Sequence, residues 1–248
     1  MSENFYKLII GIVKAGSKPL SRTRIKGLEN VPETGGIIVA PNHISNIDPV
    51  LLGVAFAPKR QLKALAKESL FSVPVVKTVL TKMGHIPVKR NSTSAAGSLE
   101  KAVEHVKKGE AVAIYPEGTI PINLETLGAF KSGAARLALI TGAPLIPVAQ
   151  WGAQHSLPRN ATLKNIRQAL RKRPLNTIVV GKPLQHKLLN GQPRDKVDPA
   201  DATQVTIALA EKIEELVEPM RNKERTRKQH KEKILDDRLK ELTLKQVF

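Results

Sequence analysis

The sequence predicts an α/β protein with a mostly parallel central sheet covered by helices. Short runs rich in apolar and β-branched residues alternate with segments of helical periodicity, which is the pattern of strands joined by crossover helices. No internal repeat or low-complexity linker interrupts this alternation. The 248 residues, 41% of them hydrophobic, suffice for one main domain with a tail.

Six strands are expected from the apolar runs. Their approximate limits are residues 36–40, 62–66, 85–88, 111–115, 144–148 and 177–180. The first of them contains Ile-Ile-Val-Ala without a polar position, which is typical of a strand buried on both faces.

Helices are expected where apolar residues recur three or four positions apart. Three such segments, with the residue that closes each, are 94–108 with Gly109, 132–140 with Gly142, and 205–217 with Pro219. The apolar segment 70–80 favours either an ordinary buried helix or a contact with lipid or an acyl chain. The segment 159–173 contains no acid and has the pattern of an interfacial helix, although a plain surface helix shows a similar apolar stripe.

The two ends of the chain differ from the main domain, which is expected at residues 25–219. Residues 1–24 are expected to form a short helical segment whose apolar side lies at a membrane interface, with Phe5, Leu8, Ile9, Ile12 and Val13. Its run of six apolar positions is too short to span a bilayer. Residues 220–248 are expected to form a basic helical tail, either a solvated extension or an electrostatic membrane contact.

The charge of the chain points to an anionic partner. Lys and Arg total 40 against 22 acidic residues, a formal net charge of +18. Aromatic residues are only 3% of the chain, which leaves little to stack on bases. An anionic membrane surface is therefore expected and nucleic acid is not. The absence of cysteine excludes disulfides, zinc-thiolate sites and thiol nucleophiles.

His43 and Asp48 are the strongest candidates for chemistry, in the stretch PNHISNIDP directly after the first strand. Their spacing alone is weak evidence, because His105 and Glu110 share it at the end of a predicted helix. On one continuous helix the pair would point about 140° apart, so they must share a loop to meet. Asp48 followed by Pro49 marks the start of a helix. A carboxylate there either caps that helix alone or also accepts the Nδ1 proton of a histidine base.

Three further blocks lie at the ends of predicted strands. Residues 84–90 end in Lys89 and Arg90, which suit a phosphate, although a polar strand end is the plain alternative. Residues 115–119 form a turn with an acid and a glycine. Residues 143–148 place two prolines around a short apolar strand, which indicates an edge or a rim.

In this order and spacing, the four blocks resemble the motifs of the glycerolipid acyltransferase family, most closely its 1-acylglycerol-3-phosphate (lysophosphatidic acid) acyltransferases. The resemblance covers roughly residues 25–183. The matching residues are Asn42, His43 and Asp48, then Gly84, Ile86 and Arg90, then Tyr115 to Thr119, and last Pro144, Ile146, Pro147 and Val148. The segment 130–133, Phe-Lys-Ser-Gly, matches a further family element. Ile120 stands where the family usually has arginine.

The resemblance implies transfer of a fatty acyl group from acyl-CoA or acyl-carrier protein to the sn-2 hydroxyl of 1-acylglycerol 3-phosphate, giving phosphatidic acid in phospholipid synthesis. It implies His43 as general base and Asp48 as the acid that orients the ring. The residues that it assigns to substrate binding are Asn42, Gly84, Lys89, Arg90, Glu117, Gly118, Thr119, Lys131, Ile146 and Pro147. No metal or redox cofactor is implied, and the acyl carrier is a co-substrate.

Within that scheme, Arg90 and Lys89 would bind the acceptor phosphate, and Lys131 could compensate for Ile120. Residues 25–219 would be the acyltransferase domain of a peripheral protein on the cytoplasmic face of a membrane. One alternative is the same chemistry on another lysolipid or glycolipid acceptor, and a second is a non-catalytic basic module that binds membrane or nucleic acid. A third, a hydrolase using Ser45, lacks a Gly-x-Ser-x-Gly elbow.

Overall fold

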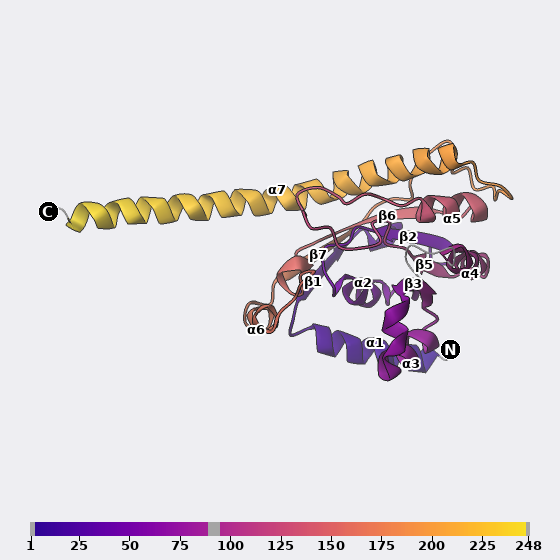
Figure 1. Ribbon diagram of the computed structural model, residues 1–248, viewed down its shortest axis with the longest axis horizontal. Coiled ribbons are helices and arrows are strands. Elements are labelled where there is room, and N and C mark those ends of the chain that lie inside the picture. The colour runs from indigo at the N-terminus through magenta and orange to yellow at the C-terminus, as the bar shows by residue number, and fades with distance from the viewer. Residues whose placement is uncertain (1–2, 89–94, 247–248) are drawn as a thin grey trace.

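The computed structural model describes residues 3–88 and 95–246, and within them seven strands form one sheet. Across the sheet the strands lie in the order β1-β7-β6-β2-β5-β3-β4 (Figure 1). Their bounds are β1 Arg22–Lys26, β2 Ile37–Pro41, β3 Leu62–Lys67, β4 Ile86–Val88, β5 Ala111–Ala113, β6 Leu145–Trp151 and β7 Leu175–Val180. Neighbouring strands are parallel except β6 and β7, which are antiparallel. The expected mostly parallel sheet is confirmed.

Helices cover both faces of the sheet (Figure 1). Their bounds are α1 Glu3–Ser17, α2 Asp48–Phe56, α3 Pro74–Lys82, α4 Ala95–Lys107, α5 Gly133–Thr141, α6 Leu163–Lys172 and α7 Pro199–Gln246. On one face, α4 and α7 pack against α5. On the other face α2 packs against the sheet, and α1 lies across α2.

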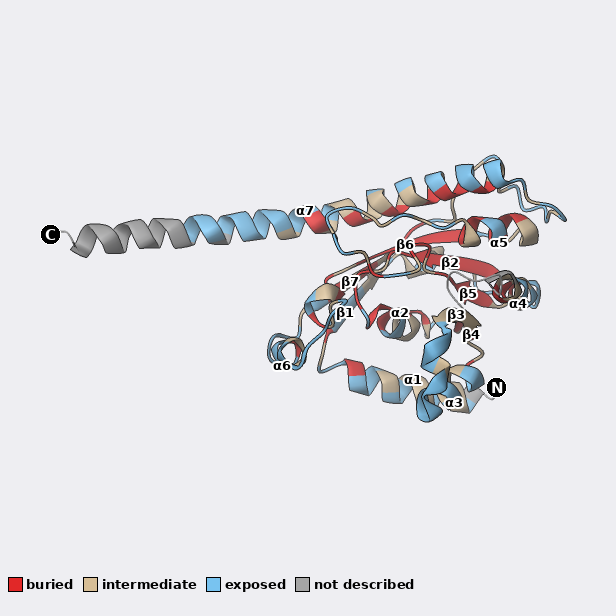
Figure 2. Cartoon of the chain, in the orientation of Figure 1, coloured by how far each residue is buried: buried red, intermediate tan, exposed pale blue. Residues whose placement is uncertain are grey.

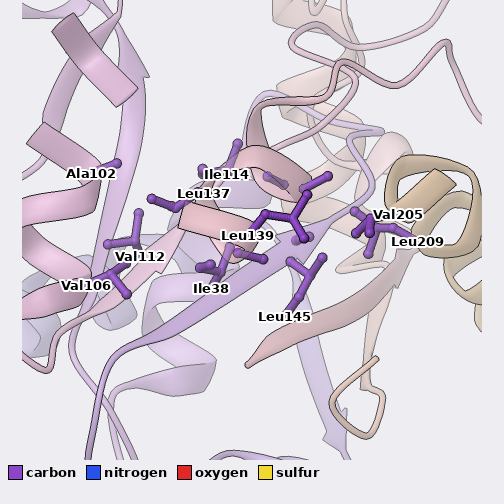
Figure 3. Packing of buried hydrophobic residues seen from close by; sticks show 14 of the residues in the cluster. Ile38, Ala102, Val106, Val112, Ile114, Leu137, Leu139, Leu145, Val205 and Leu209 are labelled. Carbon is purple, nitrogen blue, oxygen red and sulfur yellow. The ribbon is translucent and has the colours of Figure 1, made fainter. Parts of the chain in front are cut away.

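The central strand β2 is buried on both sides, as its unbroken apolar run predicts. Because side chains alternate along a strand, Ile37 and Val39 join the core under α2, whereas Ile38 and Ala40 join the core under α5. Figure 3 shows Ile38 among residues of α4, α5 and α7. The end of β2 is therefore fixed by two cores at once.

All six expected strands are present, and the closing roles of Gly109 and Gly142 agree with their left-handed φ angles of 83° and 67°. The structure also contains β1, which has no predicted counterpart and lies partly inside the predicted N-terminal segment. Its sequence, Arg-Thr-Arg-Ile-Lys, has one apolar residue, because β1 is an edge strand with mostly exposed side chains.

The prediction that a helix closes at Pro219 is wrong, because α7 runs through Pro219. Proline removes one backbone donor, but the first half of α7 is held on the sheet by Val205, Leu209, Ile213 and Val217. Beyond the proline, the buried Arg221 guanidinium binds the carboxylates of Glu214 and Glu218, so ion pairs bridge the weak point. Figure 2 shows a buried stripe on the first half of α7 and mostly exposed residues on the part beyond it whose burial is described.

The half-buried imidazole of His85, directly before β4, gives the fold a pH dependence. Its Nδ1 accepts the Ala64 backbone N–H at 2.8 Å, and burial together with the charge of Lys63 lowers the pKa of His85 from 6.5 to about 4. Between those pH values His85 is protonated in the unfolded chain but neutral in the folded chain. The stabilising contribution of neutral His85 to the unfolding free energy is therefore complete above pH 6.5 and is lost as the pH falls towards 4.

We predict that lowering the pH from 7 to 4 costs up to about 3 kcal/mol of unfolding free energy through His85. Urea unfolding of the wild type and His85→Asn measures this, because Asn keeps an acceptor near Nδ1 but does not titrate. The variant should lose less stability than the wild type over this range. An equal loss in the two proteins would contradict the assignment to His85.

Candidate active site

The loop of residues 42–47 connects the end of β2 to the start of α2, at the edge where the parallel strands end. Asp48 is the first residue of α2 and Pro49 the second. The expected strand-to-helix loop is present, and open α/β sheets commonly carry their sites at this edge.

His43 and Asp48 are in direct contact across this loop. The distance from His43 Nδ1 to Asp48 Oδ2 is 3.0 Å. A carboxylate accepts but does not donate when ionised, so Nδ1 carries the proton and Nε2 keeps its lone pair. The imidazole also lines a cavity, so the ring could accept a proton from a group in that space.

The same oxygen of Asp48 also organises the loop backbone. It accepts the N–H groups of Ile44 at 2.6 Å and Ser45 at 2.7 Å. Asp48 is fully buried, so burial raises its pKa, while the bonds from His43 and the two N–H groups act in the opposite direction. These donors and the helix N-terminus favour the carboxylate that His43 needs as its partner.

Every backbone N–H from His43 to Asp48 donates to an oxygen of the protein. Beyond those bound by Asp48, the His43 N–H donates to Glu117, the Asn46 N–H to the Leu157 carbonyl, and the remaining two to Ser45. This loop therefore holds its shape but has no spare backbone donor for an oxyanion. The Ser45 hydroxyl is itself buried and donates to the Leu157 carbonyl at 2.6 Å, a structural role that disfavours a serine nucleophile.

Glu117 connects the His43 loop to the segment after β5. Its Oε1 accepts the His43 N–H at 2.6 Å and its Oε2 accepts the Gly128 N–H at 2.9 Å. Burial raises the pKa of Glu117, and these two bonds oppose that rise. Since Glu117 is 5% exposed and absent from the cavity wall, its contacts favour a positioning role over direct contact with an acceptor.

Asn42 extends the pairing of β2 with β6 through its side chain. Its Nδ2 donates to the Gln150 carbonyl at 3.1 Å, and its Oδ1 accepts the Gln150 N–H at 2.6 Å. The Gln150 side chain in turn donates to the Tyr115 hydroxyl at 3.3 Å. Asn42 thereby anchors the residue next to His43 without lining the cavity.

Tyr115 packs its ring against His43, with ring centroids 4.5 Å apart. Burial and the nearby Asp48 charge raise the pKa of Tyr115 well above its usual value, so the hydroxyl stays protonated. Tyr115 matched a motif in the sequence, but no role followed from that match. Its position inside the block 115–119 was the only sequence signal for a role at the site. No sequence signal indicated Gln150.

Three predicted binding residues, Gly118, Thr119 and Lys131, lie together on the cavity wall. Gly118 has φ 65°, and a Cβ there would lie 3.5 Å from Lys131 Cε, so the lysine stem crosses the turn. Lys131 also donates its backbone N–H to the Pro116 carbonyl at 2.9 Å.

The other predicted residues lie elsewhere. Gly84 has φ 73° in the turn after α3, against Lys63, and it is not part of the cavity wall. Ile146 and Pro147 are buried in β6 beside β2, also off the wall. Lys89 and Arg90 lie outside the described residues.

The cavity beside His43 has a volume of about 1480 Å³. Residues of α1, α2, α3, α4 and α5 and of β3 and β5 line it, and its apolar residues include Ile10, Val13, Leu52, Val76, Val79 and Leu80. In the described part of the chain, the lysines and arginines on this wall are Lys67, Lys131, Arg136 and Arg159. A large apolar space beside a histidine and a few cations suits an anionic amphiphile. Within the same residues, no cluster of three or more His, Asp or Glu side chains could hold a metal ion.

The sequence model of the Acyltransferase family matches residues 22–151, just over half of the chain. The chain belongs to the acyltransferase family. The matched span includes the His43 loop, Glu117 and Gln150.

Several curated relatives of this chain share one name. The chain is 35% identical to the 1-acyl-sn-glycerol-3-phosphate acyltransferase of Borreliella burgdorferi over 55% of this chain and 54% of that protein. It is 30% identical to the enzyme of that name from Bacillus subtilis, over 59% of this chain and 71% of that protein. The chain thus spans about half the length of the Borreliella relative.

A solved structure shows the same fold. The 1-acyl-sn-glycerophosphate (LPA) acyltransferase PlsC from Thermotoga maritima superposes with a TM-score of 0.61 at 22% identity, covering 86% of this chain and 82% of that chain. This likeness supports the α/β architecture described above.

We predict that Asn42→Asp destabilises the protein at neutral pH. The substitution replaces the Nδ2 donor by an oxygen facing the Gln150 carbonyl, at a site that is 1% exposed. The unfolding free energy should fall by at least about 2 kcal/mol at pH 7, and by less near pH 4.5, where protonation restores a donor. Urea unfolding at both pH values measures the difference.

Asn190→Asp is the matched control, because the exposed Asn190 only accepts, from the Gln192 N–H, and aspartate keeps that acceptor. If Asn42→Asp were as stable as this control at pH 7, the pairing role of Asn42 would be contradicted.

Proposed function

We propose that this protein transfers a fatty acyl group from acyl-CoA or acyl-carrier protein to the sn-2 hydroxyl of 1-acylglycerol 3-phosphate, giving phosphatidic acid. The observation that carries the proposal is the His43–Asp48 pair, 3.0 Å apart, at the wall of a large apolar cavity. Family membership and the names of the relatives support the same reaction.

In the proposed reaction, His43 Nε2 takes the proton of the acceptor hydroxyl as its oxygen attacks the thioester carbonyl carbon. The tetrahedral intermediate then collapses, the carbon–sulfur bond breaks, and the departing thiolate receives the proton from His43. Asp48 holds the ring through Nδ1 and stabilises its charged form between these steps. The net change is one ester formed for one thioester broken.

The shape of the cavity supports a substrate with long acyl chains. Its apolar wall extends from His43 across α2 to α1 and α3. Burial of methylene groups along that wall contributes roughly 0.8 kcal/mol for each group. The alternative acceptors, another lysolipid or a glycolipid, would use the same base and wall and differ only at the headgroup.

We predict that His43→Ala lowers the turnover number roughly 10²- to 10⁴-fold, because general-base catalysis is lost. Release of free thiol from acyl-CoA or acyl-carrier protein, with a panel of lysolipid acceptors, measures the rate. His105→Ala is the matched control, since His105 also binds an acid five residues away, Glu110, but lies off the cavity wall. A folded His43→Ala protein as active as this control would refute the mechanism.

We also propose that the protein acts peripherally on the cytoplasmic face of an anionic membrane. On α1, Leu8 and Ile12 are each 59% exposed, while Tyr6, Ile10 and Val13 of the same helix line the cavity. Basic α6 is tied to the end of α1 by a bond from Arg173 Nε to the Lys18 carbonyl. The exposed apolar residues of α1 and the basic helix α6 therefore belong to neighbouring elements. In the described part of the chain, no helix combines the length and apolar character needed to cross a bilayer.

We predict that the double substitution Leu8→Gln and Ile12→Gln weakens binding to anionic vesicles on the order of tenfold, because two apolar side chains leave the interface. Vesicle flotation of the full chain measures the bound fraction. Ile207→Gln is the control, since Ile207 is 54% exposed on α7, on the opposite face of the sheet (Figure 1). Equal flotation of the two variants would place the contact elsewhere.

A further inference from the structure

Arg159 reaches the candidate active site from outside the matched family span. It lies in the connection between β6 and α6, beyond residue 151, and it lines the cavity. Its Nη1–H donates to the Ile120 carbonyl at 2.7 Å. The guanidinium is therefore fixed beside the turn that follows Glu117, although 39 positions separate Arg159 from Ile120.

The backbone that carries Arg159 is tied to the His43 loop. Asn46 Nδ2 donates to the carbonyls of Pro158 at 2.8 Å and Arg159 at 3.0 Å. The Leu157 carbonyl accepts the Asn46 N–H at 3.0 Å and the Ser45 hydroxyl at 2.6 Å. Because Asp48 holds the same loop, these bonds fix the start of the Arg159 side chain relative to the His43 ring.

A second cation flanks the same turn. Lys131 crosses Gly118 and binds the Pro116 carbonyl through its backbone N–H, while Glu117 of this turn holds the His43 N–H. Lys67 and Arg136 also line the cavity, but they make no hydrogen bond to this turn or to the His43 loop among the described residues. Among the cavity-lining cations that the structure describes, Arg159 and Lys131 are thus the ones tied to the backbone next to His43.

We propose that Arg159, together with Lys131, binds the phosphate of the acceptor and makes the site selective for an anionic headgroup. This inference rests on the proposed function. In a glycerol 3-phosphate headgroup, only two carbons and a bridging oxygen separate the reacting hydroxyl from phosphorus, so the phosphate must lie close to His43. A guanidinium carries five N–H donors, and Arg159 uses one of them within the described structure, which leaves a fork for two phosphate oxygens.

Ile120 occupies the position where the sequence resemblance led us to expect an arginine. Ile120 supplies no charge to the turn, and its side chain is 6% exposed. Instead, the Ile120 carbonyl accepts a hydrogen bond from the guanidinium of Arg159, which belongs to another segment. Residue 159 therefore brings a positive charge to the turn in addition to that of Lys131.

The test compares Arg159→Gln, Arg159→Lys and Arg22→Gln in full-length protein. Arg22 is the matched control, because it is exposed, donates once from Nε to the Arg173 carbonyl, and lies off the cavity wall. Thiol release is measured with 1-acylglycerol 3-phosphate and with uncharged monoacylglycerol, both in neutral detergent micelles.

For the phosphorylated acceptor, Arg159→Gln should lower kcat/KM roughly 10- to 100-fold, mainly through KM, and Arg159→Lys should lie between it and the wild type. The rate with monoacylglycerol and the KM of the acyl donor should stay unchanged. An equal loss with both acceptors would show that Arg159 only supports the turn, and a raised donor KM alone would assign it to the donor. Either result would overturn the proposal.

A binding measurement separates failure of this inference from failure of the proposed function. Titration calorimetry with glycerol 3-phosphate should show weaker binding to Arg159→Gln than to the wild type and Arg22→Gln, and inorganic phosphate should bind the wild type less tightly than glycerol 3-phosphate. Equal binding to all three proteins, or tighter binding of inorganic phosphate, would overturn the headgroup site. Absence of transfer to every acceptor would refute the proposed function and leave this titration to decide the role of Arg159.

Discussion

The buried carboxylate of Asp48 is the interaction on which the candidate active site depends. One oxygen, Oδ2, binds His43 Nδ1 and the N–H groups of Ile44 and Ser45, so it fixes the ring and the loop backbone together. Asp48 also begins α2, whose Leu51 is in the core, so the loop is joined directly to a helix that is anchored in the core. A carboxylate with no exposed surface needs such donors, and the loop needs such an acceptor.

Three other segments hold the loop from different sides. Glu117 reaches it from the end of β5, Gln150 from β6, and the connection after β6 reaches it through Asn46. These contacts converge because β2, β5 and β6 are parallel and end at one edge. The position of the His43 ring is therefore set by the fold itself, which is what the proposed role as a base requires.

The pair His105 and Glu110 shows what spacing alone can establish. It shares the spacing of His43 and Asp48, and its side chains are also hydrogen bonded, because α4 ends at Lys107 and the chain turns back. Yet it lies off the cavity wall. Contact follows from the local turn, whereas function requires the sheet edge and the cavity, which many distant segments build.

Local chemistry in the sequence determined much of this protein. Unbroken apolar runs predicted the buried strands, glycines marked helix ends, and Asp48 with Pro49 marked the start of α2, because each signal acts within a few residues. Long-range packing decided the rest. Three features depend on partners far along the chain: the charged edge strand β1, the continuation of α7 through Pro219, and the hydrogen bond from Arg159 to the Ile120 carbonyl. No local pattern encodes such partners.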